Sequence, residues 1–257
     1  MLKRISYFTY GVTCYGIFFL CFLYAIGFVG NLWVPKSIDA TPTTPFMSAL
    51  IIDVLLLGLF AVQHSVMARP AFKRAWTRIV PKELERSTYV LFSSLALGIM
   101  FAYWQPLGGF IWQVEDVSAQ IALYTVFAFG WALVLVSTFM INHFDLFGLR
   151  QVTLYLMGRE YTHLNFTTKL LYKNLRHPIY LGFIFAFWAT PVMTATHLLF
   201  AVATTAYILI GIQLEEKDLK KMLPEYREYS KRVPMLIPSI GNNTNDLIGA
   251  DMQTENA

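Results

Sequence analysis

The sequence predicts an all-α integral membrane protein with about six transmembrane helices. The last two helices form a tight hairpin, and a C-terminal amphipathic helix at the membrane interface follows. Of the 257 residues, 56% are hydrophobic and only 14% are charged, whereas a typical soluble domain has about 25% charged residues. The apolar residues form long runs, and the basic residues lie between these runs. Helices are expected because lipid offers no partner to an unpaired backbone N–H or carbonyl group.

Six apolar runs account for the predicted crossings, at about residues 7–30, 46–66, 88–104, 119–141, 179–193 and 197–213. The last two are short, at about 17 residues each, near the lower limit for crossing a bilayer. They are assigned to a hairpin that turns near residues 191–197, because no Asp, Glu, Lys or Arg occurs between Pro178 and Leu214. Such a hairpin returns the chain to the membrane surface that it left.

A single membrane domain is expected over residues 1–240, followed by a polar tail at 241–257 that is predicted to be disordered. Lys3 and Arg4 resemble the basic start of a signal peptide. The apolar run after them is too long for one and lacks a small-residue cleavage site, so it is predicted to stay as the first helix. Cys14 and Cys21 lie about two turns apart on this helix and cannot pair with each other. The cysteines indicate neither a disulfide framework nor a metal site.

The positions of the basic residues predict the orientation of the helices. With six crossings, the N-terminus, the connections at 68–87 and 142–177 and the segment after 213 lie on one face. They contain every Lys and Arg except Lys36. Basic connections stay in the cytoplasm, so both termini are expected there, in a multi-pass protein of the bacterial inner membrane. The lipid bilayer is therefore the expected partner, and no nucleic-acid partner is expected. The residue pattern does not distinguish a monomer from an oligomer.

Charged residues bracket the uncharged hairpin on the predicted cytoplasmic face. Arg176 and His177 lie at its start, and Glu215 and Glu216 follow its last apolar residue. Pro178 suits the first turn of a helix, whose free N–H groups and positive dipole end favour an anion. Each half also has a purely structural interpretation, as an interfacial helix start or a solvated helix end. Together they predict a small-molecule site at the membrane interface.

The segment after the paired carboxylates has the pattern of an amphipathic helix. Leu219, Tyr226 and Tyr229 lie at helical spacing before the segment ends at Val233-Pro234. Apolar and aromatic side chains on one face of a charged helix favour the membrane surface. We therefore expect this helix to lie beside the predicted site.

Polar residues within or beside the crossings are further candidates. His64 and His143 lie at the cytoplasmic ends of the second and fourth crossings and are candidate bases, although each is also compatible with a helix cap or a turn. Asp53 lies within the second crossing, where a charge is costly and often functional, although a protonated Asp paired to a neighbouring helix is also compatible. Asp53 and His64 are eleven residues apart, so they face the same side of one helix and could line a polar seam.

Two motifs bracket the uncharged hairpin. The first is Arg176-His177-Pro178-x-Tyr180-x-Gly182. The second begins at Glu215-Glu216 and continues through Glu225-Tyr226-x-x-Tyr229 to Lys231-Arg232-Val233-Pro234. Together with the hairpin, they cover about the last third of the chain and resemble the isoprenylcysteine carboxyl methyltransferases. The resemblance implies an integral membrane enzyme with S-adenosylmethionine as its methyl donor. Phospholipid methyltransferases share this layout.

The same resemblance implies a set of site residues. The residues that would line the S-adenosylmethionine pocket are Tyr172, His177, Pro178, Ile179, Tyr180, Glu215 and Glu216. The residues that would supply backbone contacts are Leu164, Asn165, Phe166 and Thr167. Arg176 joins His64 and His143 as a catalytic candidate. Gly211 stands where the prenylcysteine enzymes have an Arg that meets the substrate, which argues against a prenylcysteine acceptor.

The first two thirds of the chain contain two further motifs, Gln63-His64-Ser65-x-Met67-Ala68-Arg69-Pro70 and Glu85-Arg86-Ser87-Thr88-Tyr89. With these motifs, this part of the chain resembles the nurim-type membrane proteins. The stretch from Asn142-His143-Phe144-Asp145 to Gly148-Leu149-Arg150-Gln151 is similar to the bacterial methanethiol S-methyltransferases of that group. These resemblances imply that a small thiol is methylated at the cytoplasmic face, with methanethiol as the acceptor and dimethyl sulfide as the product.

Two alternatives stay open at the level of the sequence. One is a methyltransferase for a lipid-borne acceptor of the prenylcysteine or phospholipid type. The other is a nurim-like membrane protein without turnover, against which the intact 176–178 and 215–216 motifs argue. Saturable binding of S-adenosylmethionine distinguishes an enzyme from the non-catalytic alternative.

Overall fold

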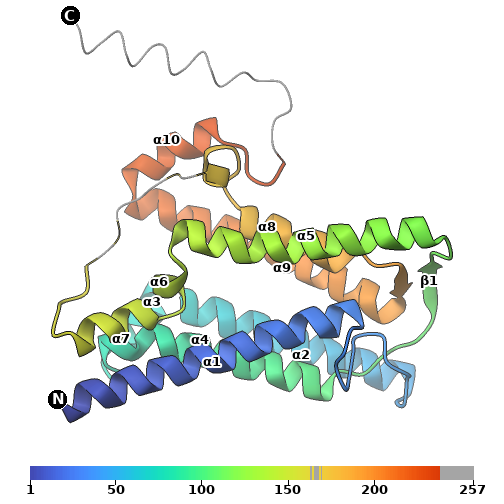
Figure 1. Ribbon diagram of the computed structural model, residues 1–257, viewed down its shortest axis with the longest axis horizontal. Helices are drawn as coiled ribbons and strands as arrows, with labels where there is room; N and C mark the ends of the chain where they lie inside the picture. The colour runs from blue at the N-terminus through green and yellow to red at the C-terminus, as the bar shows by residue number, and fades with distance from the viewer. Residues whose placement is uncertain (163, 165–167, 169, 238–257) are drawn as a thin grey trace, which may run out of the picture.

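The computed structural model describes residues 1–162, 164, 168 and 170–237, which form a helical bundle with one small sheet (Figure 1). The helices are α1 (Leu2–Gly30), α2 (Phe46–Ala68), α3 (Pro70–Trp76), α4 (Lys82–Tyr103), α5 (Val117–Ile141), α6 (His143–Leu146), α7 (Leu149–Leu156), η1 (Leu170–Lys173), α8 (Pro178–Trp188), α9 (Ala195–Met222) and α10 (Pro224–Arg232). The strands are β1 (Phe110–Gln113) and β2 (Val192–Thr194). Helices α1, α2, α5 and α9 are long and apolar enough to cross a membrane. The predicted class of helical membrane protein is therefore confirmed.

The helices are arranged in two layers. Figure 1 shows α1, α2 and α4 on one side of the bundle and α5, α8 and α9 on the other. Helix α4 packs against α1 and α2, α5 packs along α8, and α9 contacts both α8 and α2. The N-terminus, α3, α6, α7 and α10 lie at one end of the bundle, which we name the basic end. Strands β1 and β2 lie at the opposite end, which we name the sheet end.

Two glycines bring α5 and α8 close together. A Cβ atom on Gly130 would lie 2.6 Å from the backbone nitrogen of Ala186, and one on Gly182 would lie 2.7 Å from the carbonyl oxygen of Gly130. Backbone atoms cannot move aside as a flexible side chain can, so the crossing requires glycine at both positions. This packing fixes α8, and with it the residues at its start, against α5.

Aromatic side chains fill the space between the two layers. Trp104 is fully buried, and its ring meets those of Phe28 and Phe200 edge-on, with centroids 5.9 Å apart in each pair. Trp131 of α5 meets Phe183 of α8 in the same way at 5.8 Å. Edge-to-face contacts of this kind add to the stabilisation from burial. They belong to one apolar core that joins both layers.

A short sheet and a buried polar cluster close the sheet end. Strands β1 and β2 pair antiparallel, with Phe110 opposite Thr194. The Thr194 hydroxyl donates a hydrogen bond to Asp39, whose other oxygen lies 3.0 Å from Nδ1 of His197. Nε2 of His197 lies 3.0 Å from the carbonyl oxygen of Phe187. The cluster therefore joins the connection after α1 to the start of α9.

The hairpin differs from its predicted bounds. Helix α8 ends at Trp188 instead of 193, and its 11 residues span about 16 Å, less than the hydrocarbon core of about 30 Å. Pro191 cannot donate a helical hydrogen bond, and the chain beyond it enters β2. Helix α9 continues to Met222 instead of ending near 213, so the paired carboxylates lie within the helix.

Two other predicted segments also have different bounds. Helix α4, the third predicted crossing, begins at Lys82 and has Ser and Thr residues on its buried face, so it is less apolar than the four long helices. The predicted amphipathic helix is shorter than expected, because α10 begins only at Pro224. It buries Tyr226 and Tyr229. The predicted tail at 241–257 lies outside the described residues.

Candidate functional site at the basic end

Glu216 is the centre of an ion-pair network at the basic end. Its Oε1 accepts a hydrogen bond from Nε of Arg176 at 2.7 Å and lies 3.1 Å from Nε2 of His177. Its Oε2 accepts from Nζ of Lys220 at 2.9 Å. The side chains of Arg176 and Glu216 are only 11% and 10% exposed. A charge so far from water needs partners of this kind, and these partners fix the start of α8 against α9.

Arg176 also holds the segment that follows α10. Its Nη1 donates hydrogen bonds of 2.6 Å to the carbonyl oxygens of Ser230 and Val233. Its backbone N–H donates to the carbonyl oxygen of Pro234 at 3.0 Å. The contacts of Arg176 among the described residues therefore join α8, α9 and the end of α10.

Glu215 has different hydrogen-bond partners from those of Glu216. Its Oε2 accepts a hydrogen bond of 2.9 Å from the Tyr180 hydroxyl, and its charge also acts on the hydroxyl groups of Tyr89 and Tyr172. Among the described residues, no Lys, Arg or His forms an ion pair with Glu215. This carboxylate is therefore available to a cation.

Three tyrosines meet beside Glu215, and we name Tyr89, Tyr180 and Tyr207 the tyrosine cluster. They come from α4, α8 and α9, and the Tyr180 hydroxyl interacts electrostatically with those of the other two. The Tyr207 hydroxyl lies 3.1 Å from Oγ of Ser65 on α2. Four helices therefore contribute to one polar region. Tyr89 and Tyr207 were not predicted as site residues, although a Tyr within an apolar run is a signal that could have found them.

His64 joins the tyrosine cluster from α2. Its Nε2 lies 2.9 Å from the Tyr89 hydroxyl, and its Nδ1 lies 3.1 Å from Oγ of Ser93. Its ring stacks on that of Phe60, with centroids 5.2 Å apart. A neutral imidazole has one donor and one acceptor nitrogen. His64 can therefore exchange a proton with Tyr89, whose hydroxyl interacts electrostatically with Glu215.

His143 belongs to a separate network. Its Nε2 lies 2.8 Å from the Tyr15 hydroxyl, and its Nδ1 lies 2.8 Å from Oγ1 of Thr138. The side chain is buried, with 3% exposure. Both ring nitrogens are thus engaged by residues of α1 and α5. Of the two histidines, His64 has the closer connection to Glu215.

Arg86 places positive charge beside the tyrosine cluster, and Lys73 interacts electrostatically with Arg86. The Arg86 guanidinium lies 5.0 Å from the centroid of the Tyr89 ring. Burial, reinforced by Arg86 and Arg69, lowers the pKa of Lys73. Arg69 is paired with Asp218 at 3.0 Å. Glu85 interacts electrostatically with Lys73, and Nε of Arg86 donates a hydrogen bond of 2.6 Å to the carbonyl oxygen of Leu146. Among the described residues, neither cation forms an ion pair within 4 Å of a carboxylate, so the region keeps positive charge that favours an anion.

Other predicted residues lie outside this network or outside the described chain. Pro178 and Ile179 form the first turn of α8, which no side chain among the described residues caps. Leu164 is exposed. Asp53 is fully buried, but it accepts a hydrogen bond of 2.8 Å from the backbone nitrogen of Gln105 near the sheet end and forms no seam with His64. The residues that fall outside the described chain are Asn165, Phe166 and Thr167.

The stretch from Asn142 to Gln151 is explained largely by local structure. The Asn142 side chain accepts a hydrogen bond of 3.1 Å from the backbone nitrogen of Asp145, and Asp145 pairs with Arg150 at 3.0 Å. Gly148 has a φ of 86°, and a Cβ atom there would lie 2.7 Å from the backbone nitrogen of Ser87. Only glycine fits this position without strain. These residues fold the connection after α5 against α4.

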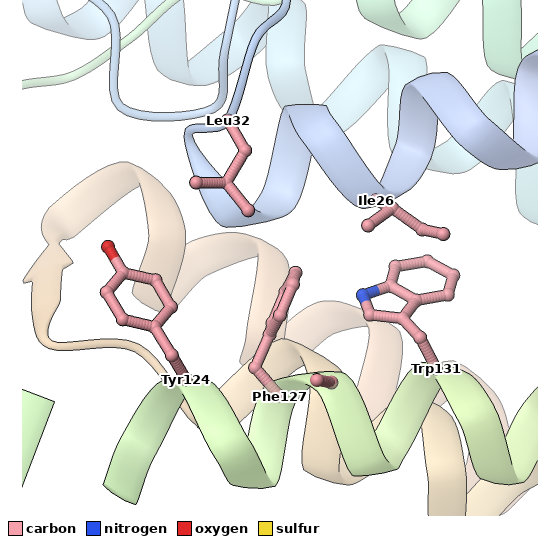
Figure 2. Close-up of a pocket in the computed structure, with 6 residues that line it drawn as sticks. Ile26, Leu32, Tyr124, Phe127 and Trp131 are labelled. Atoms are coloured by element: carbon pink, nitrogen blue, oxygen red, sulfur yellow. The ribbon is translucent and has the colours of Figure 1, made fainter. Parts of the chain in front are cut away.

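An apolar pocket of about 450 Å³ lies away from this site. Figure 2 shows Phe127 and Trp131 of α5 extending toward Ile26 of α1 and the nearby Leu32. None of the residues that line it is charged, and none belongs to the predicted site. We therefore place the candidate active site at Glu215 and the tyrosine cluster.

No protein-family model and no solved structure matches the chain. Its sequence is 55% identical to the methanethiol S-methyltransferase of Crocosphaera subtropica over 244 residues, which cover 95% of this chain and 96% of that protein. It is 52% identical to the methanethiol S-methyltransferase of Mycobacterium tuberculosis, over 92% of this chain and 98% of that protein. The chain belongs to the methanethiol S-methyltransferase family. Members of this family are methyltransferases, so the predicted class of enzyme is confirmed.

Nurim is a more distant relative of this methyltransferase family. Nurim of Xenopus laevis is 32% identical to the chain over 188 residues, which cover 70% of this chain and 66% of nurim. The predicted resemblance to both groups is therefore confirmed.

Proposed function

We propose that the chain transfers a methyl group from S-adenosylmethionine to methanethiol and forms dimethyl sulfide. The proposal rests on Glu215, a carboxylate that is bound by Tyr180 and faces the tyrosine cluster. It also rests on the names of relatives that share half of the sequence or more. The relatives suggest the acceptor, and the chemistry of the site suits a positively charged donor.

The described residues fit the groups of S-adenosylmethionine. Glu215 would attract a cation such as its sulfonium or ammonium group. The Tyr172 hydroxyl is buried and has no partner among the described residues. Burial and the charge of Glu215 raise the pKa of Tyr172, so this hydroxyl stays neutral and can donate. The uncapped start of α8 offers N–H groups to an anion. The remaining proposed cofactor contacts are Leu164, Asn165, Phe166 and Thr167.

The acceptor reacts as a thiolate, because a thiol is a poor nucleophile. An ordinary thiol has a pKa of about 8.5, so little thiolate is present at neutral pH. His64 is the proposed base, and Lys73 and Arg86 would stabilise the negative charge that follows. When bound, S-adenosylmethionine would supply an electrophilic methyl group, which would pass to the thiolate sulfur while the electron pair of the broken bond stays with the donor.

The other candidates receive structural roles in this proposal. Arg176 and Glu216 hold α8, α9 and α10 together, with His177 beside them. His143 fixes the end of α5 to α1 through Tyr15. These residues position the site, and none of them is proposed to react with the acceptor.

We propose six crossings in one membrane domain over residues 1–240. Helix α4 would supply a fifth crossing, and α8 together with the residues that follow it up to β2 would supply the sixth. Six crossings would place the N-terminus and α10 on the same face of the membrane, and both lie at the basic end (Figure 1). Basic residues favour the cytoplasmic side, so the site would face the cytoplasm of a bacterial inner membrane.

The test uses membranes from cells that express the full chain. They are given S-adenosylmethionine and methanethiol, and dimethyl sulfide is measured in the headspace, with Glu215→Ala as the control. We expect dimethyl sulfide from the wild type and its loss in Glu215→Ala at equal amounts of folded protein. Wild-type membranes that bind the donor without forming dimethyl sulfide would exclude methanethiol as the acceptor.

A further inference from the structure

One face of α9 carries Tyr207, Gly211 and Glu215 at intervals of four residues. Residues at this spacing lie one above the other on an α-helix. The face is directed toward α2, because Tyr207 lies 3.1 Å from Ser65 and Asp218 lies 3.0 Å from Arg69. The middle of this face therefore lies between two contacts with α2.

The two contacts do not keep the same spacing on both helices. Ser65 and Arg69 are about 6 Å apart along α2, whereas Tyr207 and Asp218 are about 16 Å apart along α9. The long side chains of Tyr207 and Arg69 cover the difference. Between Tyr207 and Asp218, α9 runs for about three turns, and Gly211 lies in this interval.

Gly211 leaves this interval open. A Cβ atom built on Gly211 meets no heavy atom within 4 Å, in contrast to Gly130 and Gly182, whose Cβ atoms would collide with backbone. Its backbone is helical, and glycine within a helix costs about 1 kcal/mol relative to alanine. Gly16, Gly58 and Gly98 have equally open surroundings. What distinguishes Gly211 is its position between Tyr207 and Glu215 on the face directed toward α2.

The residues around this space belong to the site described above. Glu215 lies one turn from Gly211 toward the basic end, and Tyr207 lies one turn toward the sheet end. His64 precedes Ser65 on α2 and contacts Tyr89. Tyr207 and Glu215 thus flank the space along α9, and Ser65, the neighbour of the proposed base His64, contacts Tyr207 from α2.

We propose that the space over Gly211 receives the alkyl group of the acceptor thiol, so that the missing side chain at this position sets the size of the acceptor. This inference rests on the proposed function and adds the place where the acceptor binds. The two contacts between α2 and α9 close the interval at both ends. A side chain at 211 would occupy the same space and leave Tyr172 and Tyr180 unchanged.

The test is a series of substitutions at this position: Gly211→Ala, Gly211→Val and Gly211→Leu. The matched control is Gly58→Leu, because a Cβ on Gly58 of α2 also meets no heavy atom within 4 Å. Gly58 is exposed and lies outside the site. All of these changes replace a helical glycine with a better helix former, so the variants are expected to fold. The readouts are kcat/KM for methanethiol, ethanethiol and propanethiol, and calorimetric binding of S-adenosylmethionine to the purified chain.

We expect Gly211→Ala to raise the preference for methanethiol over propanethiol by about tenfold or more, the usual effect of steric selection in a small apolar pocket. Gly211→Leu is expected to lose turnover of all three thiols while donor binding is unchanged. Equal turnover in Gly211→Leu and Gly58→Leu would overturn the acceptor pocket. Loss of donor binding in Gly211→Leu would also overturn it. A wild-type chain that methylates no thiol would instead overturn the proposed function.

Discussion

Glu215 and Glu216 are adjacent in the sequence, but their carboxylates belong to different networks. Glu216 accepts a hydrogen bond of 2.7 Å from Arg176, whereas Glu215 accepts one of 2.9 Å from Tyr180. Neighbouring residues on a helix point about 100° apart, so α9 directs one carboxylate into the ion-pair network and the other toward the tyrosine cluster. We therefore expect the two residues to have different functions.

Glu215→Gln is expected to weaken donor binding with little effect on folding. The substitution keeps the shape of the side chain and removes the charge that would attract the sulfonium or ammonium group. Binding of S-adenosylmethionine to the purified chain, measured by calorimetry, tests this expectation. Unchanged affinity in Glu215→Gln would contradict the assignment of Glu215 to the donor.

Glu216→Gln is expected to lower the free energy of unfolding by about 3 kcal/mol, because Arg176 would keep a buried charge without its carboxylate. Denaturant unfolding in detergent measures this change. Glu228→Gln is the matched control, since Glu228 forms an exposed ion pair with Lys231 at 2.8 Å, and exposed pairs contribute little. Equal stability in the two variants would show that the Glu216 network is not structural.

His64→Gln is expected to make turnover depend more steeply on pH. Without the base, the rate would follow the thiolate in solution, which increases about tenfold per pH unit below the pKa of the thiol. The deficit relative to the wild type is therefore largest at low pH. Rates from pH 6 to 9 at constant thiol concentration, a range of about three units around that pKa, measure the effect. His143→Gln is expected to keep the wild-type profile. Parallel profiles in His64→Gln and the wild type would exclude His64 as the base.

Gly182→Ala is expected to destabilise the chain by about 1–3 kcal/mol, the usual cost of overpacking. Its Cβ would lie 2.7 Å from the carbonyl oxygen of Gly130 and 2.9 Å from the backbone nitrogen of Val134. The control is Gly58→Ala, where the Cβ is free. Thermal unfolding in detergent compares the two variants, and an equal shift in both would rule out the close crossing of α5 and α8.

Long-range contacts explain why only part of the fold could be predicted. The runs at 7–30, 46–66 and 119–141 gave bounds close to those of α1, α2 and α5, because a long apolar helix is encoded locally. The end of α8 was misplaced because it depends on the pairing of β2 with the distant β1. Such pairing leaves no periodic signal in either short segment.

The sequence also predicted only some of the residues of the candidate site. The motifs at 176–178 and 215–216 identified the basic end, but the rotation of α9 decides which carboxylate meets Arg176. Tyr89 and Tyr207 were missed because one Tyr in an apolar run is also typical of a helix core. Their meeting point depends on the packing of α4 against the other layer.

The most direct test of the central claim uses S-adenosylmethionine with a deuterated methyl group. Purified wild-type chain is incubated with this donor and unlabelled methanethiol, and the headspace product is analysed by mass spectrometry beside Glu215→Gln. The account predicts dimethyl sulfide that carries one labelled methyl group from the wild type, with little from Glu215→Gln. Unlabelled product, or equal labelled product from both proteins, would contradict it.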